Sequence, residues 1–179
     1  MSIWSDESFT RAMARHRDLV FRVAYTYMRD AADADDVAQA VFVKLFGAKA
    51  PFESDDHLKN WLVKVTVNEC RSLFRKPWRR VEDIEAYAHA LALPTREHGE
   101  VLVAVMRLPD RYRVPIVLHY YGRFSTDEIA GLTGVKPATV RKRLARARGK
   151  LKLMIEEGDH GREGMRADDA RVDGLHARV

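Results

Sequence analysis

The sequence contains a single cysteine, Cys70, so the chain cannot form an internal disulfide or a zinc site built on several cysteines. It has no run of about 18 consecutive apolar residues, the minimum for a membrane-spanning helix. Residues 1–9 do not combine a basic segment with an apolar one, as a secretion signal does. These absences predict a protein of the reducing cytoplasm that is not inserted in a membrane.

Recognisable catalytic patterns are missing as well. The seven histidines show no repeated metal-ligand spacing. No glycine-rich phosphate loop and no serine, histidine and acid set stands out. We therefore expect no enzyme, no catalytic residue, no metal and no cofactor; activity on DNA by the isolated chain would contradict this expectation.

The chain does contain ample apolar sequence and unevenly placed charge. Of its 179 residues 46% are hydrophobic, which suffices for one ordinary domain or two small ones. The net charge is only +5, but Arg71 to Arg80 holds five basic and no acidic residues. Arg141 to Lys152 holds seven basic residues and again no acidic one. Two separate cationic surfaces suggest a polyanion that is contacted twice.

Apolar residues in the first half recur every three or four positions, which predicts helices. The first helix should span residues 6–28. A second should begin in the acidic stretch 33–36, whose carboxylates favour a helix N-terminus, and end at Gly47. After a loop over 47–56, a third helix should continue until Pro77 stops it.

The second half shows another helical pattern between residues 97 and 157, interrupted at Leu108-Pro109. Residues 81–96 are acidic and alanine-rich without a strong apolar period, which predicts a linker. The tail, 158–179, has several glycines and alternating charges, which predicts disorder. No pairing of strands is evident, so the expected fold is all-α, with small helical domains over 1–80 and 97–157.

One segment carries a specific local signal. Ser125 and Glu128 fit the capping box, in which each side chain satisfies an unpaired backbone N–H at a helix start. Gly134 supplies the residue that a sharp corner between helices needs, and Pro137 suits the first position of the next helix. Its outward residues are largely Arg and Lys. Together these features predict a helix-turn-helix with a recognition helix for the DNA major groove.

An alternative is that the cationic run from Arg141 to Lys152 is only the solvated face of an ordinary helix, as most charge runs are. The run is wholly cationic and starts soon after the Gly134 corner, so DNA binding is favoured. Three aromatic residues also have plain interpretations. Trp61, Tyr120 and Tyr121 are predicted to pack in the domain cores rather than to stack on bases, and His16 is predicted to be a satisfied buried residue.

Four segments of the second half resemble region 4 of the extracytoplasmic-function (ECF) sigma factors of RNA polymerase: Leu108–Arg113, Leu118–Tyr121, Phe124–Ala130 and Thr139–Arg148. In the first half, Asp33–Phe42 resembles region 2.2 of that family. Trp61–Asn68 with the basic run that follows resembles regions 2.3 and 2.4. The order and spacing agree over roughly residues 8–157.

The resemblance implies a subunit that binds core RNA polymerase and directs promoter-specific initiation through two DNA elements. Residues implied to read the −35 element are Thr139, Arg141, Lys142, Arg143, Ala145 and Arg146. Residues implied to hold an unstacked base and the single strand at the −10 element are Lys64, Asn68, Arg71, Ser72 and Arg75. Residues implied to dock on the polymerase clamp are Asp35, Asp36, Gln39 and Phe42.

The sequence departs from the family pattern at two positions. Ala40 stands where an acidic residue is common. Pro115 lies in a predicted helix and should either kink this helix or delay its start. The resemblance also implies control by an anti-sigma factor, often membrane-anchored. A rival hypothesis is a stand-alone helix-turn-helix regulator with an N-terminal sensing or dimerising domain. It predicts specific binding to duplex DNA without polymerase.

Overall fold

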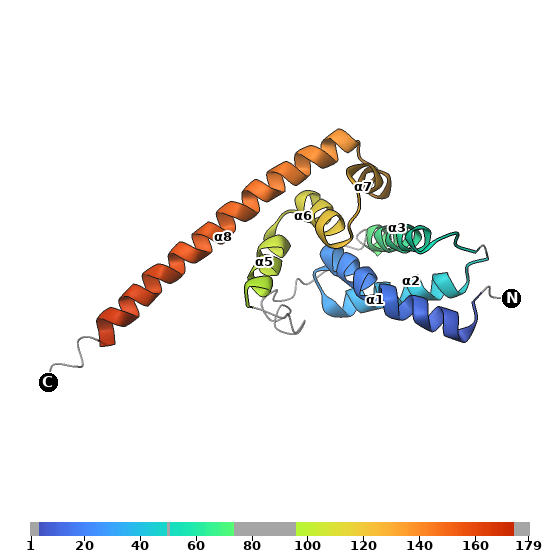
Figure 1. Cartoon of the computed structure of the whole chain (residues 1–179), viewed down its shortest axis with the longest axis horizontal. Coiled ribbons are helices and arrows are strands. Elements are labelled where there is room, and N and C mark those ends of the chain that lie inside the picture. The colour runs from blue at the N-terminus through green and yellow to red at the C-terminus, as the bar shows by residue number, and fades with distance from the viewer. Residues whose placement is uncertain (1–3, 50, 74–95, 174–179) are drawn as a thin grey trace.

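The computed structural model describes residues 4–49, 51–73 and 96–173, with side chains from 101 to 156 in the last of these ranges. Throughout these ranges the regular structure is helical, and the helices form two groups (Figure 1). The first group is α1 (Asp6–Met28), α2 (Ala31–Phe46) and α3 (Asp55–Leu73). The second is α5 (Arg96–Arg107), α6 (Asp110–Ile116), the π-helical turn η1 (Val117–Tyr121), α7 (Thr126–Thr133) and α8 (Pro137–Asp173). The expected all-α fold with two helical domains is confirmed.

Local capping explains where the first helices begin. Ser5 and Ser8 form a reciprocal capping box at the start of α1, which has the bounds that the apolar period predicts. The side chain of Asp30 accepts a hydrogen bond from the N–H of Asp33 over 2.8 Å. Because Asp30 caps α2, this helix begins at Ala31, slightly before the acidic stretch where we expected its start. Its C-terminal cap is Gly47, as predicted.

The third helix completes the core of the first domain. Ser54 accepts a hydrogen bond from the N–H of His57 over 3.1 Å and so caps α3. Leu62 and Val67 of α3 are fully buried, as are Val20 of α1 and Val41 of α2. The predicted stop at Pro77, the −10 residue Arg75 and the linker up to residue 95 lie outside the described residues.

A proline and a π-helical turn shape the second domain. The predicted break at Leu108-Pro109 separates α5 from α6. Pro115 lies inside α6, so it does not delay the start of this helix. Because proline has no N–H to donate within the helix, it weakens the regular ladder, and the π-helical turn η1 follows directly.

Helix α8 extends past residue 157 to Asp173, into the segment for which the sequence predicts disorder. No proline interrupts this stretch. Figure 1 shows α8 projecting well beyond the other helices. Among the described residues, no helix is both long enough and apolar enough to cross a membrane.

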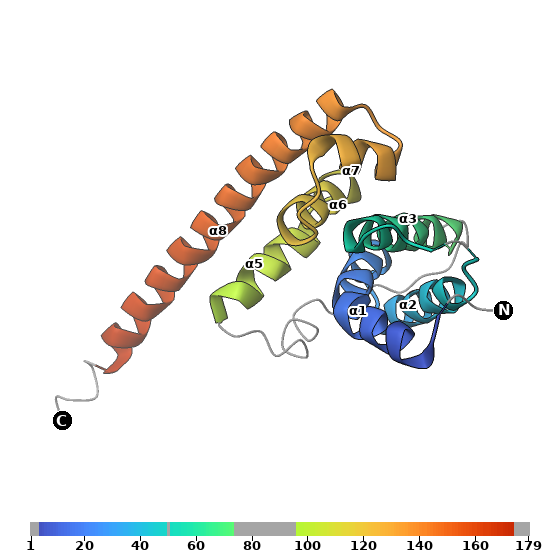
Figure 2. The same ribbon diagram turned by 45° about the vertical axis from the view of Figure 1, so that its right-hand side comes forward.

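The two domains pack against each other. Helix α1 contacts α6 and η1, and α3 contacts α7. Figure 2 shows α3 beside α1, with the second group of helices alongside. Buried apolar residues of both domains form one continuous cluster, from Val20 and Leu62 in the first to Phe124 and Leu144 in the second.

Candidate nucleic-acid interface

The helix-turn-helix has the local geometry that the sequence predicts. Ser125 Oγ accepts from the N–H of Glu128 over 3.2 Å, and a Glu128 carboxylate oxygen accepts from the N–H of Ser125 over 2.8 Å. The Ser125 hydroxyl donates to the same carboxylate oxygen, and the hydrogen bonds from the N–H and the hydroxyl of Ser125 lower the pKa of the Glu128 carboxyl, with a smaller contribution from nearby Asn60 and Lys59. At the corner, Gly134 adopts the left-handed conformation with φ 71°, and its N–H bonds the Ala130 carbonyl.

The first turns of α8 separate an inner from an outer face. Val140, Leu144 and Ala147 are buried against the domain. On the outer face, four of the predicted −35 residues are exposed: Arg141, Lys142, Ala145 and Arg146. The other two, Thr139 and Arg143, are half-buried at its edges. A cationic helix face with small Ala145 near its centre can approach a DNA groove closely.

Two tyrosines outside α8 touch its arginines, and the sequence prediction missed both. The Arg146 side chain lies near the Tyr112 hydroxyl of α6 and lowers its pKa. Arg148 Nη1 donates to the hydroxyl of Tyr120 over 3.4 Å. The Tyr112 ring packs in the core, while Arg146 is exposed. The signal in the sequence was weak because α6 and α8 are far apart in the chain.

The prediction that Tyr120 and Tyr121 anchor the core of the second domain is wrong. Their side chains are 57% and 42% exposed. In the π-helical turn both fall outside the apolar face, where Leu118 is buried instead. Tyr121 reaches the first domain, where its hydroxyl donates to the carboxylate of Asp18.

A second cationic face runs along α3. The predicted −10 residues Lys64, Asn68, Arg71 and Ser72 are all exposed on this helix. Their spacing of three to four residues, with Asn68 and Ser72 four apart, places them on one side of it. Arg71 is not entirely free, since its Nη2 donates to the carbonyl of Thr133 in α7 over 2.6 Å.

Aromatic residues hold the loop that precedes α3. Phe52 packs on Trp61 with ring centroids 5.5 Å apart and on Trp4 with centroids 6.0 Å apart. Trp4 Nε1 in turn donates to the carbonyl of Leu45 over 2.9 Å. Trp61 is half-buried against the core, in agreement with its expected packing role. His16 is buried, as expected, with Nε2 2.9 Å from a carboxylate oxygen of Asp55.

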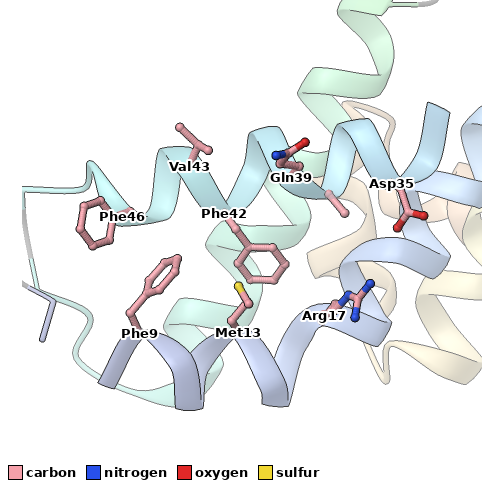
Figure 3. A pocket seen from close by; sticks show the side chains of 9 residues that line it. Phe9, Met13, Arg17, Asp35, Gln39, Phe42, Val43 and Phe46 are labelled. Atoms are coloured by element: carbon pink, nitrogen blue, oxygen red, sulfur yellow. The ribbon is translucent and has the colours of Figure 1, made fainter. Parts of the chain in front are cut away.

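A groove of about 550 Å³ lies between α1 and α2 (Figure 3). Gln39 and Asp35, two of the predicted polymerase contacts, line it, and buried Phe42 forms its floor. Asp36 is exposed on the same helix. The prediction missed the most accessible apolar residues of the groove, Val43 and Phe46, which are 66% and 46% exposed. Phe9, Met13 and Arg17 complete the groove from α1.

Comparison with protein families finds matches in both domains. Residues 12–80 match the model for sigma-70 region 2. Residues 98–151 match the model for sigma-70, region 4. The two matches coincide with the α3 and α8 faces described above, one in each domain.

Curated proteins with similar sequences carry related names. The ECF RNA polymerase sigma factor SigM of Mycobacterium tuberculosis is 29% identical over 152 residues, which are 83% of this chain and 77% of that protein. RNA polymerase sigma factor SigV of Bacillus subtilis is 27% identical, over 80% of this chain and 89% of that one. ECF sigma factor EcfG of Rhodopseudomonas palustris is 30% identical, over 68% of this chain and 71% of that one.

Two solved structures have a similar fold. The sigma factor RpoE of Bartonella quintana, in a complex with the anti-sigma factor NepR, aligns with a TM-score of 0.65 at 19% identity. That alignment covers 84% of this chain and 98% of RpoE. CnrH, in a complex with the cytosolic domain of CnrY, aligns with a TM-score of 0.59 at 27% identity, over 86% of this chain and 90% of CnrH.

Proposed function

This chain belongs to the sigma-70 family of RNA polymerase sigma factors, in the ECF class, and we propose that it binds core RNA polymerase and selects promoters through the −10 and −35 elements. The observation that carries the proposal is the presence of two cationic helix faces in separate domains. One face lies on the first turns of α8, and the other lies on α3. A single chain that binds two separate stretches of one DNA molecule needs a cationic face for each stretch.

In this proposal α8 enters the major groove at the −35 element. Arginine bonds guanine bidentately, so Arg141 and Arg146 read bases, and Lys142 contacts base or phosphate. Thr139, Arg143 and Ala145 contact the same groove at its edges. The exposure of Arg141 and Arg146 on the outer face of α8 supports this assignment.

At the −10 element α3 holds the unpaired strand. Asn68 and Ser72 offer hydrogen-bonding groups to an extruded base, and Lys64, Arg71 and Arg75 neutralise the backbone. The loop before α3, fixed by Phe52, forms the wall of this pocket. Promoter opening then depends on trapping flipped bases, and the chain acts as a binding subunit without chemistry of its own.

We further propose that α2 docks on the polymerase clamp. Asp35, Asp36 and Gln39 supply its polar contacts, and Phe42 shapes the apolar floor behind them. The exposed Val43 and Phe46 extend this contact surface by one turn. An apolar groove with a polar rim suits a partner helix.

An anti-sigma factor is the expected regulator. NepR bears that description in the complex with RpoE, whose fold this chain shares. We propose a comparable protein inhibitor that covers the polymerase-binding and DNA-binding faces. Because polymerase and promoter are its partners, the chain would act in the bacterial cytoplasm.

Run-off transcription with core polymerase on a genomic promoter library tests the proposal. Adding the chain should produce transcripts with defined start points that core polymerase alone does not make. Start-specific transcripts should disappear from templates whose −10 or −35 segment is replaced. Repression by the chain without polymerase would favour a stand-alone regulator and contradict the proposal.

A further inference from the structure

Two tyrosines from other elements lie beside the exposed face of α8, one at each edge of it. Arg146 and Arg148 are two positions apart on this helix, so their side chains leave it about 200° apart. Tyr112 of α6 lies near Arg146, and the hydroxyl of Tyr120 in η1 accepts a hydrogen bond from Arg148. The exposed face therefore has a Tyr112 edge and a Tyr120 edge.

Positive charge gathers at the Tyr112 edge. The guanidinium carbon of Arg111 lies 5.1 Å from the centroid of the Tyr112 ring. Arg146 and Lys150 are exposed and lie about one turn apart on α8. Arg146 above all, and Arg111 and Lys150 with it, lower the pKa of the Tyr112 hydroxyl. Three cations from two helices thus lie close to one hydroxyl group.

No carboxylate neutralises this cluster. Among the residues that the structure describes, Arg111, Arg146 and Lys150 form no ion pair, whereas Lys152 pairs with Glu156 on the same helix. Asp110 adjoins Arg111 in the sequence, but Asp110 accepts a hydrogen bond from the buried Arg113. Like charges that are held close repel one another, and an anion bound between them relieves this repulsion. The cluster therefore favours an anionic ligand.

The Tyr120 edge presents an exposed but well-held aromatic side chain. Tyr120 is 57% exposed, and Arg148 Nη1 donates to its hydroxyl over 3.4 Å. The His119 ring packs edge-on against Tyr120 with centroids 4.9 Å apart. His119 Nδ1 lies 2.8 Å from the carbonyl oxygen of Phe124, which can only accept, so Nδ1 donates and fixes the imidazole. Tyr120 and Arg148 thus offer a hydroxyl and a guanidinium to solvent side by side.

The positions of the two edges along α8 suit the walls of a DNA groove. Lys150 is nine residues beyond Arg141, or about 13 Å along the helix axis. The major groove is about 12 Å wide. When the first turn of a recognition helix contacts base edges, later turns therefore reach the phosphates beside the groove. Guanidinium, ammonium and hydroxyl groups are the side-chain donors that phosphate oxygens bind.

We propose that the two edges of α8 form a phosphate clamp on the −35 duplex. Arg111 and Lys150 bind a backbone phosphate of one strand, and Tyr120 and Arg148 bind a phosphate of the other strand. The Tyr112 ring holds the Arg111 guanidinium by a cation–π contact. The clamp rests on the proposed function for its place at the −35 element, whereas phosphate binding at the two edges does not.

The clamp divides the work of α8 between two kinds of contact. Phosphates are the same in every sequence, so the clamp fixes the depth and angle of the helix in the groove without selecting bases. Selection is left to the residues nearer the start of the helix, such as Arg141. Loss of a clamp residue should therefore weaken binding equally for all −35 sequences.

The first arm of the test uses the free, full-length chain and duplex DNA of arbitrary sequence, with fluorescence anisotropy over a series of salt concentrations. Arg111→Gln, Lys150→Gln and Arg148→Gln remove one charge each. Each should lower the slope of log affinity against log salt by about 0.9, which weakens binding at 0.1 M salt by roughly eightfold. Tyr120→Phe should weaken binding about threefold with an unchanged slope, because its hydroxyl is neutral.

Lys152→Gln is the matched control. Lys152 is exposed on the same helix, but Nζ lies 3.7 Å from a carboxylate oxygen of Glu156. Its removal should change the slope by less than half as much as removal of a clamp cation. Circular dichroism verifies that every variant keeps its helices. Equal slopes for the control and the clamp variants, or no binding by the unaltered chain at the lowest salt, overturn the clamp.

The second arm assigns each edge to a strand. Holoenzyme formed with core polymerase is bound to promoter fragments in which single phosphates beside the −35 element are replaced by neutral methylphosphonates. Replacement at one position on one strand should weaken binding of the Arg148→Gln holoenzyme and of the unaltered one, but have little effect with Lys150→Gln. A position on the other strand should give the reverse. Losses that are the same for both variants at every position overturn the clamp.

Fragments with matched and mutated −35 sequences separate the clamp from the proposed function. The affinity ratio between them should stay unchanged in Arg111→Gln and Lys150→Gln. A lowered ratio would show that these residues read bases and would overturn the clamp. Equal affinity of the unaltered holoenzyme for both fragments, beside the lowered slopes of the first arm, would contradict the proposed function, while phosphate binding at the two edges would stand.

Discussion

Arg113 Nε donates a hydrogen bond to the carbonyl oxygen of Thr26 and so ties the second helical domain to the end of α1. The Arg113 side chain is almost fully buried, and its other nitrogens bond the carbonyls of Met106 and Leu108 at 2.9 Å and the carboxylate of Asp110. Burial lowers the pKa of Arg113, but the guanidinium stays charged because its ordinary pKa is so high. One buried cation thus organises the α5–α6 corner and the contact between the domains.

Replacing Arg113 by Lys should destabilise the protein by about 3 kcal/mol. Lysine keeps the charge but cannot donate hydrogen bonds to three carbonyls and a carboxylate at once. Some of these buried acceptors would therefore lose their donors. Urea unfolding followed by circular dichroism measures the effect. The exposed neighbour Arg111 is the control, and Arg111→Lys should change the free energy of unfolding by less than about 0.5 kcal/mol. Equal effects at both positions would contradict the role assigned to Arg113.

Loss of the capping box should weaken the helix-turn-helix. Ser125→Ala removes the acceptor for the N–H of Glu128 and should cost about 1 kcal/mol of stability. Thr126→Ala, one residue into the helix, is the control and should cost less. Thermal unfolding measures both, and a larger loss for Thr126→Ala would contradict the capping assignment.

The same box predicts a pH dependence with a definite sign. The pKa of Glu128 is lowered in the folded protein, so its ionised form is favoured by folding. The stabilisation is present above the ordinary pKa of this carboxyl, 4.5, and is lost as pH falls through the lowered value. Glu128→Gln should therefore lose more stability at pH 7 than at pH 3. An equal loss at the two pH values, measured by urea unfolding, would rule out this coupling.

Arg141→Ala and Arg146→Ala should each weaken discrimination of the −35 sequence by ~1 to 3 kcal/mol while leaving core-polymerase binding intact. Competition between matched and mutated promoter fragments, with the chain bound to core polymerase, measures this difference. Arg11→Ala removes the same charge from α1 and should not change discrimination. Normal promoter reading by both α8 variants would disprove the recognition-helix assignment.

The groove between α1 and α2 should be needed for polymerase binding. Val43→Asp places a charge on its most exposed apolar residue and should weaken the affinity for core polymerase at least ~10-fold, because an unpaired carboxylate would be desolvated. Thr10→Asp on the exposed side of α1 is the control. Fluorescence anisotropy with labelled chain measures the two affinities. Identical affinities would place the contact elsewhere.

Local structure was predictable where it depends on the types of a few neighbouring residues, as at helix caps and tight corners. The apolar period gave the bounds of α1, and the Ser125 box with Gly134 predicted the corner, because capping and left-handed backbone depend on near neighbours. The end of α8 was not predictable in this way, since the helix continues to Asp173 without an apolar stripe that would announce it.

The contacts between the domains could not be predicted from the sequence. Arg113 bonds a backbone carbonyl of Thr26, and every residue has one, so no residue type marks the acceptor. The assignment of Tyr121 to a core assumed a regular helix. It is wrong because the π-helical turn points this side chain in a different direction. Val43 and Phe46 could have been found, since they follow Gln39 by four and seven positions and so share its face of the helix.

Binding to core RNA polymerase is the most direct test of the account as a whole. The purified full-length chain, free of other proteins, is titrated with core polymerase in the absence of DNA, and complex formation is followed by anisotropy and size-exclusion chromatography. The account predicts saturable binding at one chain per polymerase, strongly weakened by Val43→Asp and unaffected by Arg141→Ala. No association, or association that Val43→Asp and Arg141→Ala weaken equally, would contradict it.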